Sequence, residues 1–202
     1  MDCTMSLEQI IARCLEVGIN CLGIADHNTI AGAKKMKEIA PFSIIVGEEI
    51  LTLDGEVIGF FLSQEIPSKL PMKETVAQIK AQNGLVCIPH PYDRLRMSVF
   101  RDQVFDDIMN DVDIIEAFNA RSLSAGSSTR ARQLAQKYGK PASAGSDAHT
   151  LPEIGNAYVE MPDFNGKDKF LASLAKGKIS GNKSNPTAHF ISTWNRLKKR
   201  LS

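Results

Sequence analysis

The feature that most constrains the fold is a regular alternation of short apolar runs with segments of helical periodicity. Strand-length apolar runs lie at 21–25, 43–46, 85–88 and 113–118, and helical patterns lie at 30–39, 71–82 and 128–138. This rhythm predicts an α/β fold with a mostly parallel sheet. With 202 residues, 43% of them hydrophobic, the chain can build one core. We expect a single domain over 1–202, as a closed or nearly closed barrel; an open doubly wound sheet is the alternative.

Two local patterns refine this outline. Ser6 and Gln9 have the spacing of a capping box in front of an amphipathic helix. Asp54-Gly55 predicts a turn that pairs residues 50–53 with residues 56–62 as a hairpin. No predicted strand is followed by G-x-G-x-x-G or G-x-x-x-x-G-K-[ST], so the sequence supports neither a dinucleotide site nor a P-loop.

The charge balance excludes partners that are attracted by a strong net field. Lysine plus arginine is 24 and aspartate plus glutamate is 23, which gives a net charge of +1. Such a chain has no surface predicted to bind duplex nucleic acid or an anionic membrane. No apolar run approaches the roughly 18 residues of a spanning helix, and the first residues are not those of a signal peptide. We expect a soluble, cytoplasmic protein whose four cysteines are reduced.

Residues that bind metals follow the predicted strands. These residues are Asp26-His27, Glu48-Glu49, His90, Asn119, and Asp147 with His149. In a parallel α/β barrel the carboxyl ends of the strands converge on one face, so these side chains should surround one pocket. Histidine and carboxylate ligands without thiolates suit Zn, Mn or Fe in a hydrolytic site.

Each of these residues also has a structural interpretation when taken alone. Asp26 can cap the following helix, His90 can sit in a proline turn, and a Glu-Glu pair is usually a solvated charge. Three of the four histidines nevertheless come directly after strands, which scattered core histidines would not do. This joint pattern favours a metal site, and His189 lies outside it.

Five ordered motifs resemble the PHP family, named for polymerase and histidinol phosphatase. The motifs are I-A-D-H-N-T at 24–29, G-E-E-I at 47–50, I-P-H-P at 88–91, I-E-A-F-N at 115–119 and G-S-D-A-H-T at 145–150. The resemblance covers about residues 2–160 and leaves 161–202 as a helical closure. It implies a distorted (β/α)7 barrel, a site for two or three divalent metal ions, and phosphoesterase activity.

The resemblance also implies roles for single residues. The implied metal ligands are His27, Glu49, His90, Asp147 and His149, with Glu49 as the bridging carboxylate. Glu49, Asp147 and His149 are the implied catalytic residues. Asn119 stands where other members carry a different ligand or a polar neighbour.

One departure from the family pattern concerns the amino terminus. Members open with a strand bearing His-x-His, and this chain resembles the segment after that strand, with Asp2 at the acidic position. We therefore expect a barrel whose first strand is missing or truncated. Exposed sheet edges of such a barrel would favour a homodimer or strand exchange.

These observations predict a metal-dependent phosphoesterase in which a metal-bound hydroxide attacks a phosphomonoester or a nucleotide phosphodiester. Arg94, Arg96 and Arg121 are candidate phosphate ligands, because each lies close to a strand end and guanidinium binds phosphate bidentately. A small phosphorylated metabolite or nucleotide fits the charge balance better than duplex nucleic acid. The alternative is a binding or regulatory module that keeps the fold without catalysis. A metal-dependent amidohydrolase fits less well, because no lysine follows a strand at the expected face.

Overall fold

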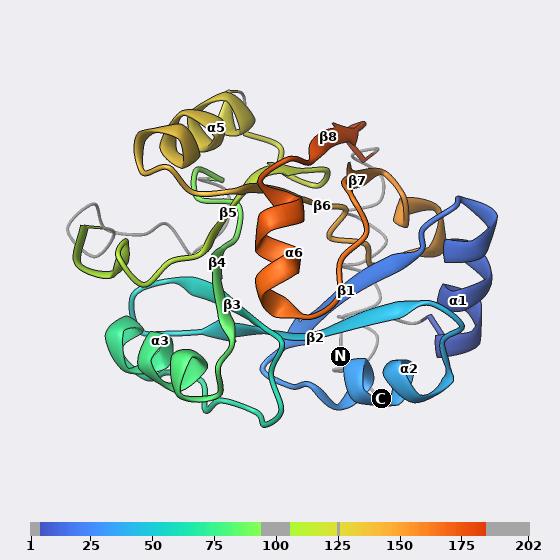
Figure 1. Ribbon diagram of the computed structural model, residues 1–202, viewed down its shortest axis with the longest axis horizontal. Helices are drawn as coiled ribbons and strands as arrows, with labels where there is room; N and C mark the ends of the chain where they lie inside the picture. Colours follow the sequence, from blue (N-terminus) through green and yellow to red (C-terminus); the bar gives the residue numbers. More distant parts are fainter. Residues whose placement is uncertain (1–4, 94–105, 125, 185–202) are drawn as a thin grey trace, which may run out of the picture.

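The computed structural model describes residues 5–93, 106–124 and 126–184 (Figure 1). The helices are α1 (Leu7–Glu16), α2 (Ala31–Ile39), α3 (Met72–Ala81), α5 (Ser127–Lys137) and α6 (Lys167–Leu174), with a 3-10 turn η1 (Leu151–Glu153). The strands are β1 (Cys21–His27), β2 (Ser43–Leu51), β3 (Glu56–Phe60), β4 (Leu85–Ile88), β5 (Ile114–Asn119), β6 (Ala142–Gly145), β7 (Ala157–Glu160) and β8 (Lys178–Gly181). None of the described helices has the length and apolar character needed to cross a membrane.

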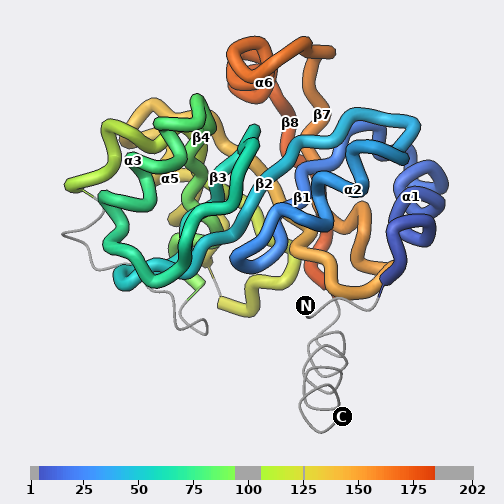
Figure 2. The backbone as a smooth tube through the Cα atoms, turned by 90° about the horizontal axis from the view of Figure 1, so that it is seen from below, coloured from blue at the N-terminus to red at the C-terminus, as the bar shows by residue number. Residues whose placement is uncertain are grey.

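The main sheet has six strands in the order β1-β2-β3-β4-β5-β6 and curls into a half barrel. Three neighbouring pairs are parallel, namely β1 with β2, β4 with β5 and β5 with β6. Strand β3 runs antiparallel to both of its neighbours. A separate antiparallel pair, β7 and β8, lies beside α6 at the top of Figure 2. The predicted α/β class is confirmed, whereas the sheet of the described residues is open and has six strands rather than the seven of a complete barrel.

Both local predictions are borne out. The Ser6 N–H donates to Gln9 Oε1 at 2.9 Å, and the Gln9 N–H donates to Ser6 Oγ at 3.3 Å, which completes the capping box of α1. Strands β2 and β3 form the expected hairpin, and the Thr52 hydroxyl closes its turn by donating to Gly55 O at 2.7 Å.

The two faces of the sheet pack against different helices. The outer face of the strands packs against the start of α2 and against α3 in one apolar cluster. The strands contribute Val46, Ile50, Val57, Val86, Ile88 and Ile115 to this cluster, and the helices contribute Ile30, Ala33, Met72, Val76 and Ile79. The inner, concave face carries Ile45, Leu85, Cys87 and Ile114, which pack against Phe170 and Leu174 of α6. Phe170 also makes edge-to-face contacts with Phe61 and Phe164, at centroid distances of 5.4 and 5.1 Å.

The inner face changes from apolar to polar along the strands. Alternate residues of a strand share one face, so Glu49 lies on the same face as Ile45, and Glu116 on the same face as Ile114. The apolar end of this face is covered by α6. Its other end, at the carboxyl ends of the parallel strands, therefore presents acidic side chains to the concave interior.

Glu48 occupies the opposite, outer face of β2. Its side chain is fully buried, and Oε2 accepts a hydrogen bond from the Ile66 N–H at 2.9 Å. The other oxygen, Oε1, has no hydrogen-bond partner among the described residues. Burial raises the pKa of the Glu48 carboxyl above its ordinary value, which means that the folded state favours the neutral acid.

This buried carboxyl should make stability depend on pH. Because the pKa of Glu48 is raised on folding, its contribution is full below the ordinary glutamate pKa and is lost as pH rises through the raised value. We expect Glu48→Gln to raise the free energy of unfolding relative to wild type by about 1–3 kcal/mol more at about pH 8 than at about pH 4.5, because the neutral amide avoids a buried charge. Urea unfolding at both pH values measures the difference, with exposed Glu74→Gln as the control. An equal difference at both pH values would contradict the assignment.

Candidate metal centre

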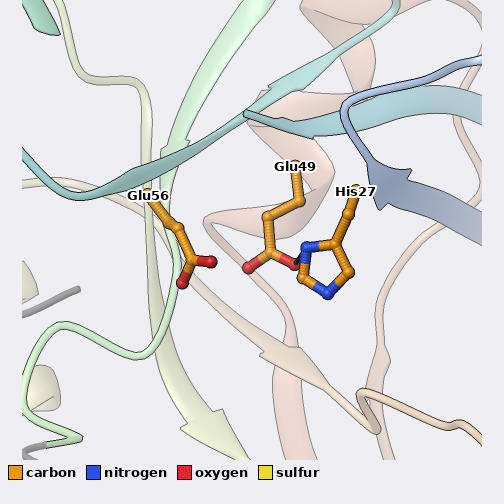
Figure 3. Close-up of side chains that lie close together, drawn as sticks. All are labelled: His27, Glu49 and Glu56. Atoms are coloured by element: carbon orange, nitrogen blue, oxygen red, sulfur yellow. Dashed lines mark ion pairs between the residues drawn. The ribbon is translucent and has the colours of Figure 1, made fainter. Parts of the chain in front are cut away.

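Three ligand-type side chains meet at the polar end of the inner face. His27 ends β1, Glu49 lies near the end of β2, and Glu56 begins β3. One ligand atom from each of these residues lies within 4.8 Å of the other two (Figure 3). The strand register explains the meeting, because His27 is the Cα partner of Glu49 in the parallel β1–β2 pair.

Glu49 is the centre of this group. Its Oε2 lies 3.2 Å from His27 Nδ1, and its Oε1 lies 3.1 Å from His90 Nε2. His90 Nε2 also lies 3.9 Å from Glu56 Oε2. Glu49 and His90 are buried, whereas the His27 side chain is 45% exposed. The structure therefore brings together three of the five predicted ligands, His27, Glu49 and His90, around one carboxylate.

Glu56 was not among the residues expected from the sequence. In the β2–β3 hairpin it is the Cα partner of Leu51, and Glu49 is the partner of Ile58, so all four side chains share one face. The predicted hairpin turn contained the information needed to find Glu56. The pattern that predicts the other ligands consists of residues at strand ends, whereas Glu56 stands at the start of a strand.

Asp147 and His149 form a second group after β6. His149 Nδ1 lies 2.9 Å from Asp147 O and 3.6 Å from Asp147 Oδ1. Burial raises the pKa of the Asp26 carboxyl at the end of β1, and the nearby imidazoles of His27 and His149 oppose this rise. The Asp147–His149 group thus faces the end of β1 from the other edge of the sheet.

Glu116 and Asn119 join the two groups. Glu116 Oε2 accepts the His90 N–H at 2.7 Å and the Asn119 Nδ2 amide at 3.1 Å. The same amide nitrogen lies 3.5 Å from Asp147 Oδ2. Burial raises the pKa of the Glu116 carboxyl, with a smaller opposing effect from His90 and a further rise from Asp147. Glu116 lies inside the I-E-A-F-N motif, yet it was not predicted as a site residue.

Strained backbone marks the same loops. Three residues that are not glycine have positive φ after β1, β4 and β6: Asn28 at 53°, His90 at 29° and Asp147 at 50°. Such conformations cost on the order of 1–3 kcal/mol for residues other than glycine and tend to cluster at functional sites. Asn28 is held by its N–H to Glu49 O at 2.9 Å and by the Leu51 N–H to its Oδ1 at 3.1 Å.

The three arginines predicted to bind phosphate differ in what can be described. Arg94 and Arg96 lie outside the described residues. Arg121 is 5% exposed, and its Nη1 lies 3.4 Å from Glu153 Oε2. The Arg121 backbone N–H donates to Asn119 Oδ1 at 2.9 Å. Arg121 is therefore connected, through Asn119, to the Glu116 carboxylate.

Comparison with known proteins agrees with this architecture. Residues 127–179 match the model of the family described as PHP-associated. A crystal structure from Bacteroides vulgatus, of a two-domain protein containing a predicted PHP-like metal-dependent phosphoesterase, superimposes with a TM-score of 0.71 at 15% identity and covers 90% of this chain and 61% of that one. Residues 127–179 therefore match the PHP-associated family, and the chain shares the fold of PHP-like structures.

Two further relatives are informative about the extent of the likeness. A structure from Bifidobacterium adolescentis, provisionally assigned as a metal-dependent phosphoesterase, has a TM-score of 0.62 at 14% identity and covers 96% of this chain and 92% of that one. An uncharacterized protein of Methanocaldococcus jannaschii is 36% identical over 145 residues, which are 70% of this chain. The chain spans 58% of the length of that relative.

The hydrogen bonds of Glu116 predict a cost for its removal. Glu116→Ala leaves the buried His90 N–H and the Asn119 amide without their acceptor, and each unsatisfied buried donor costs about 1–3 kcal/mol. We expect urea unfolding of chelator-treated protein to show a loss in this range or above it. The exposed Glu160→Ala substitution on β7 is the control and should stay within about 0.5 kcal/mol of wild type. A loss no larger than that of the control would mean that Glu116 does not support the loop of His90.

Proposed function

We propose that this protein is a PHP-type metal-dependent phosphoesterase that hydrolyses a small phosphomonoester or a nucleotide phosphodiester. The observation that carries the proposal is the Glu49 carboxylate between the imidazoles of His27 and His90, with Glu56 beside them. Two imidazoles and two carboxylates at the polar end of a concave sheet face form a typical ligand set for a hydrolytic metal ion.

The chemistry of the donor atoms fits Zn, Mn or Fe. All proposed ligands offer nitrogen or oxygen, which suits these metals. Cys21 and Cys87 lie in the apolar cluster under α6, at the other end of the inner face from these ligands, and burial raises the pKa of both thiols. We propose that His27, Glu49, His90 and Glu56 hold one ion, and that Asp147 and His149 contribute to a second. Divalent ions at such a site supply a hydroxide from water near neutral pH and neutralise phosphoryl charge.

The residues of the chain would share the remaining work. Glu49 would be the ligand shared between the ions, as the family resemblance implies, and its two oxygens lie toward the imidazoles of His27 and His90. Glu116 holds the His90 backbone, and Asn119 links Glu116 to Asp147. Arg94, Arg96 and Arg121 are proposed to bind the phosphate, because guanidinium binds phosphate bidentately.

The direct test measures metal and turnover together. Protein purified without chelator is analysed for bound elements, and hydrolysis of an aryl phosphate is followed with added Mn²⁺ or Zn²⁺. One to three ions per chain with metal-dependent turnover are expected, following the site for two or three ions that the family resemblance implies. Bound metal without turnover would leave a metal-binding module, and absence of both would overturn the proposal.

Asp147→Asn should separate the chemistry from the fold. Asparagine is close in shape to aspartate and tolerates the left-handed backbone, which matters because Asp147 has φ 50°. The substitution removes a charged ligand, so we expect metal-dependent turnover to fall by at least about 100-fold while the unfolding midpoint changes little. Turnover and urea unfolding are measured on the same preparations. Full activity in the variant would exclude Asp147 from the site.

Glu56→Gln tests the ligand that the sequence did not reveal. Loss of this carboxylate should weaken metal binding by about 10-fold or more, measured by calorimetric titration of chelator-treated protein with Mn²⁺. Glu74→Gln on the exposed face of α3 is the matched control and should bind as wild type does. Equal affinities for both variants would show that Glu56 lies beside the metal without binding it.

A further inference from the structure

Glu153 lies directly after the Asp147–His149 group, as the last residue of η1, and is only 3% exposed. Carboxylates are rarely buried to this extent without a partner of opposite charge. Neither the sequence motifs nor the proposed metal ligands include this residue. Thr150 and Glu153 form the capping box of η1, which accounts for the hydrogen bonds between these two residues but not for the contacts of Glu153 with His149 and Arg121.

A single oxygen of Glu153 receives four donors. Oε2 accepts the His149 N–H at 3.0 Å, the Thr150 N–H at 3.0 Å and the Thr150 hydroxyl at 2.9 Å, and Arg121 Nη1 lies 3.4 Å away. Oε1 is buried without a hydrogen-bond partner in the part of the chain that the structure describes. A carboxylate that served only to satisfy Arg121 would share both oxygens with the guanidinium, because that fork geometry is the favoured one. The concentration of donors on Oε2 instead indicates that the Glu153 carboxylate also holds the backbone of His149 and Thr150.

These contacts join two loops that carry proposed site residues. His149 and Thr150 follow β6, whereas Arg121 follows β5 and is itself tied to Asn119 by its backbone N–H at 2.9 Å. Glu153 thus connects the backbone of His149, after β6, to the loop after β5 that carries Asn119 and Arg121. The imidazole is then close enough for Nδ1 to lie 2.9 Å from Asp147 O.

The contact between Nδ1 and the carbonyl oxygen has a chemical consequence. A carbonyl oxygen only accepts, so Nδ1 must carry the proton in this contact, and Nε2 keeps its lone pair. A histidine whose other nitrogen donates to a carbonyl is the usual form of a metal ligand, and its ring orientation is fixed in the same way. We propose that Glu153 is a positioning residue that holds His149 in the Nδ1–H tautomer with Nε2 available to bind metal. This role rests on the proposed function, since it assigns His149 to the metal site.

The test compares Glu153→Gln with wild type in two independent measurements. In chelator-treated protein at about pH 8, nitrogen NMR of the imidazoles reports the tautomer of His149, whose resonances are identified by their loss in His149→Gln. We expect wild type to show mainly the Nδ1–H form and Glu153→Gln to show a mixture. Titration with Mn²⁺ should show an affinity about 10–100-fold lower in the variant. Glu160→Gln, an exposed glutamate on β7, should match wild type in both measurements.

A second variant guards against a simple failure to fold. Glu153→Gln alone leaves the Arg121 guanidinium buried opposite a neutral amide, which is strongly destabilising. The double substitution Arg121→Gln with Glu153→Gln exchanges the ion pair for two amides and avoids that unpaired charge. It should fold and still show the mixed tautomer and the weaker Mn²⁺ binding.

The outcomes separate this inference from the proposed function. If wild type binds Mn²⁺ and the folded variants bind it equally well with an unchanged His149 tautomer, the positioning role is wrong. If wild type binds no metal, the proposed function fails, and the tautomer comparison in the chelated protein still decides the role of Glu153. A tautomer change together with weaker binding supports both.

Discussion

The alternation of side chains along strands of the curled sheet is the constraint on which the candidate site depends. On the inner face, apolar residues such as Ile45 and Ile114 pack against α6, and acidic residues of the same strands, Glu49 and Glu116, follow further along. The helix therefore fills one end of the concave face and leaves the other end polar. Burial of the apolar end stabilises the curvature that brings the polar ends together.

Buried carboxylates in this protein differ in how their charge is satisfied. Glu116 and Glu153 accept N–H groups from the backbone and side chains of the loops at strand ends, so each orders a part of the site. Glu48 lies on the other face and has only one backbone donor. The same residue type thus serves the site on one face of β2 and weakens the core on the other, because an incompletely satisfied buried carboxyl is costly.

Much of this arrangement could be predicted from the sequence, and the failures have physical causes. The motifs ending β1, β2 and β4 gave His27, Glu49 and His90, because parallel strands place their carboxyl ends at one edge. Glu56 was missed because β3 runs antiparallel and offers its first residue at that edge. Thr150 and Glu153 have the local spacing of a capping box, but only the fold brings Arg121 to Glu153, so its place beside the site could not be predicted. Closure of the sheet is likewise a property of the whole fold and could not be inferred from local periodicity.

The antiparallel insertion of β3 gives the turn at Thr52–Gly55 an importance beyond closing the hairpin. Hairpin register is set by turn length, and a shift of one residue moves every side chain of a strand to the other face. Glu56 follows that turn directly, whereas Glu49 precedes it. Related chains that differ by one residue in this turn would keep the sheet and its core residues on β2 while exchanging Glu56 for an outward-facing neighbour. The number of acidic groups in the centre is therefore coupled to the length of a surface turn, and homologues could diverge in metal preference without any substitution of a ligand.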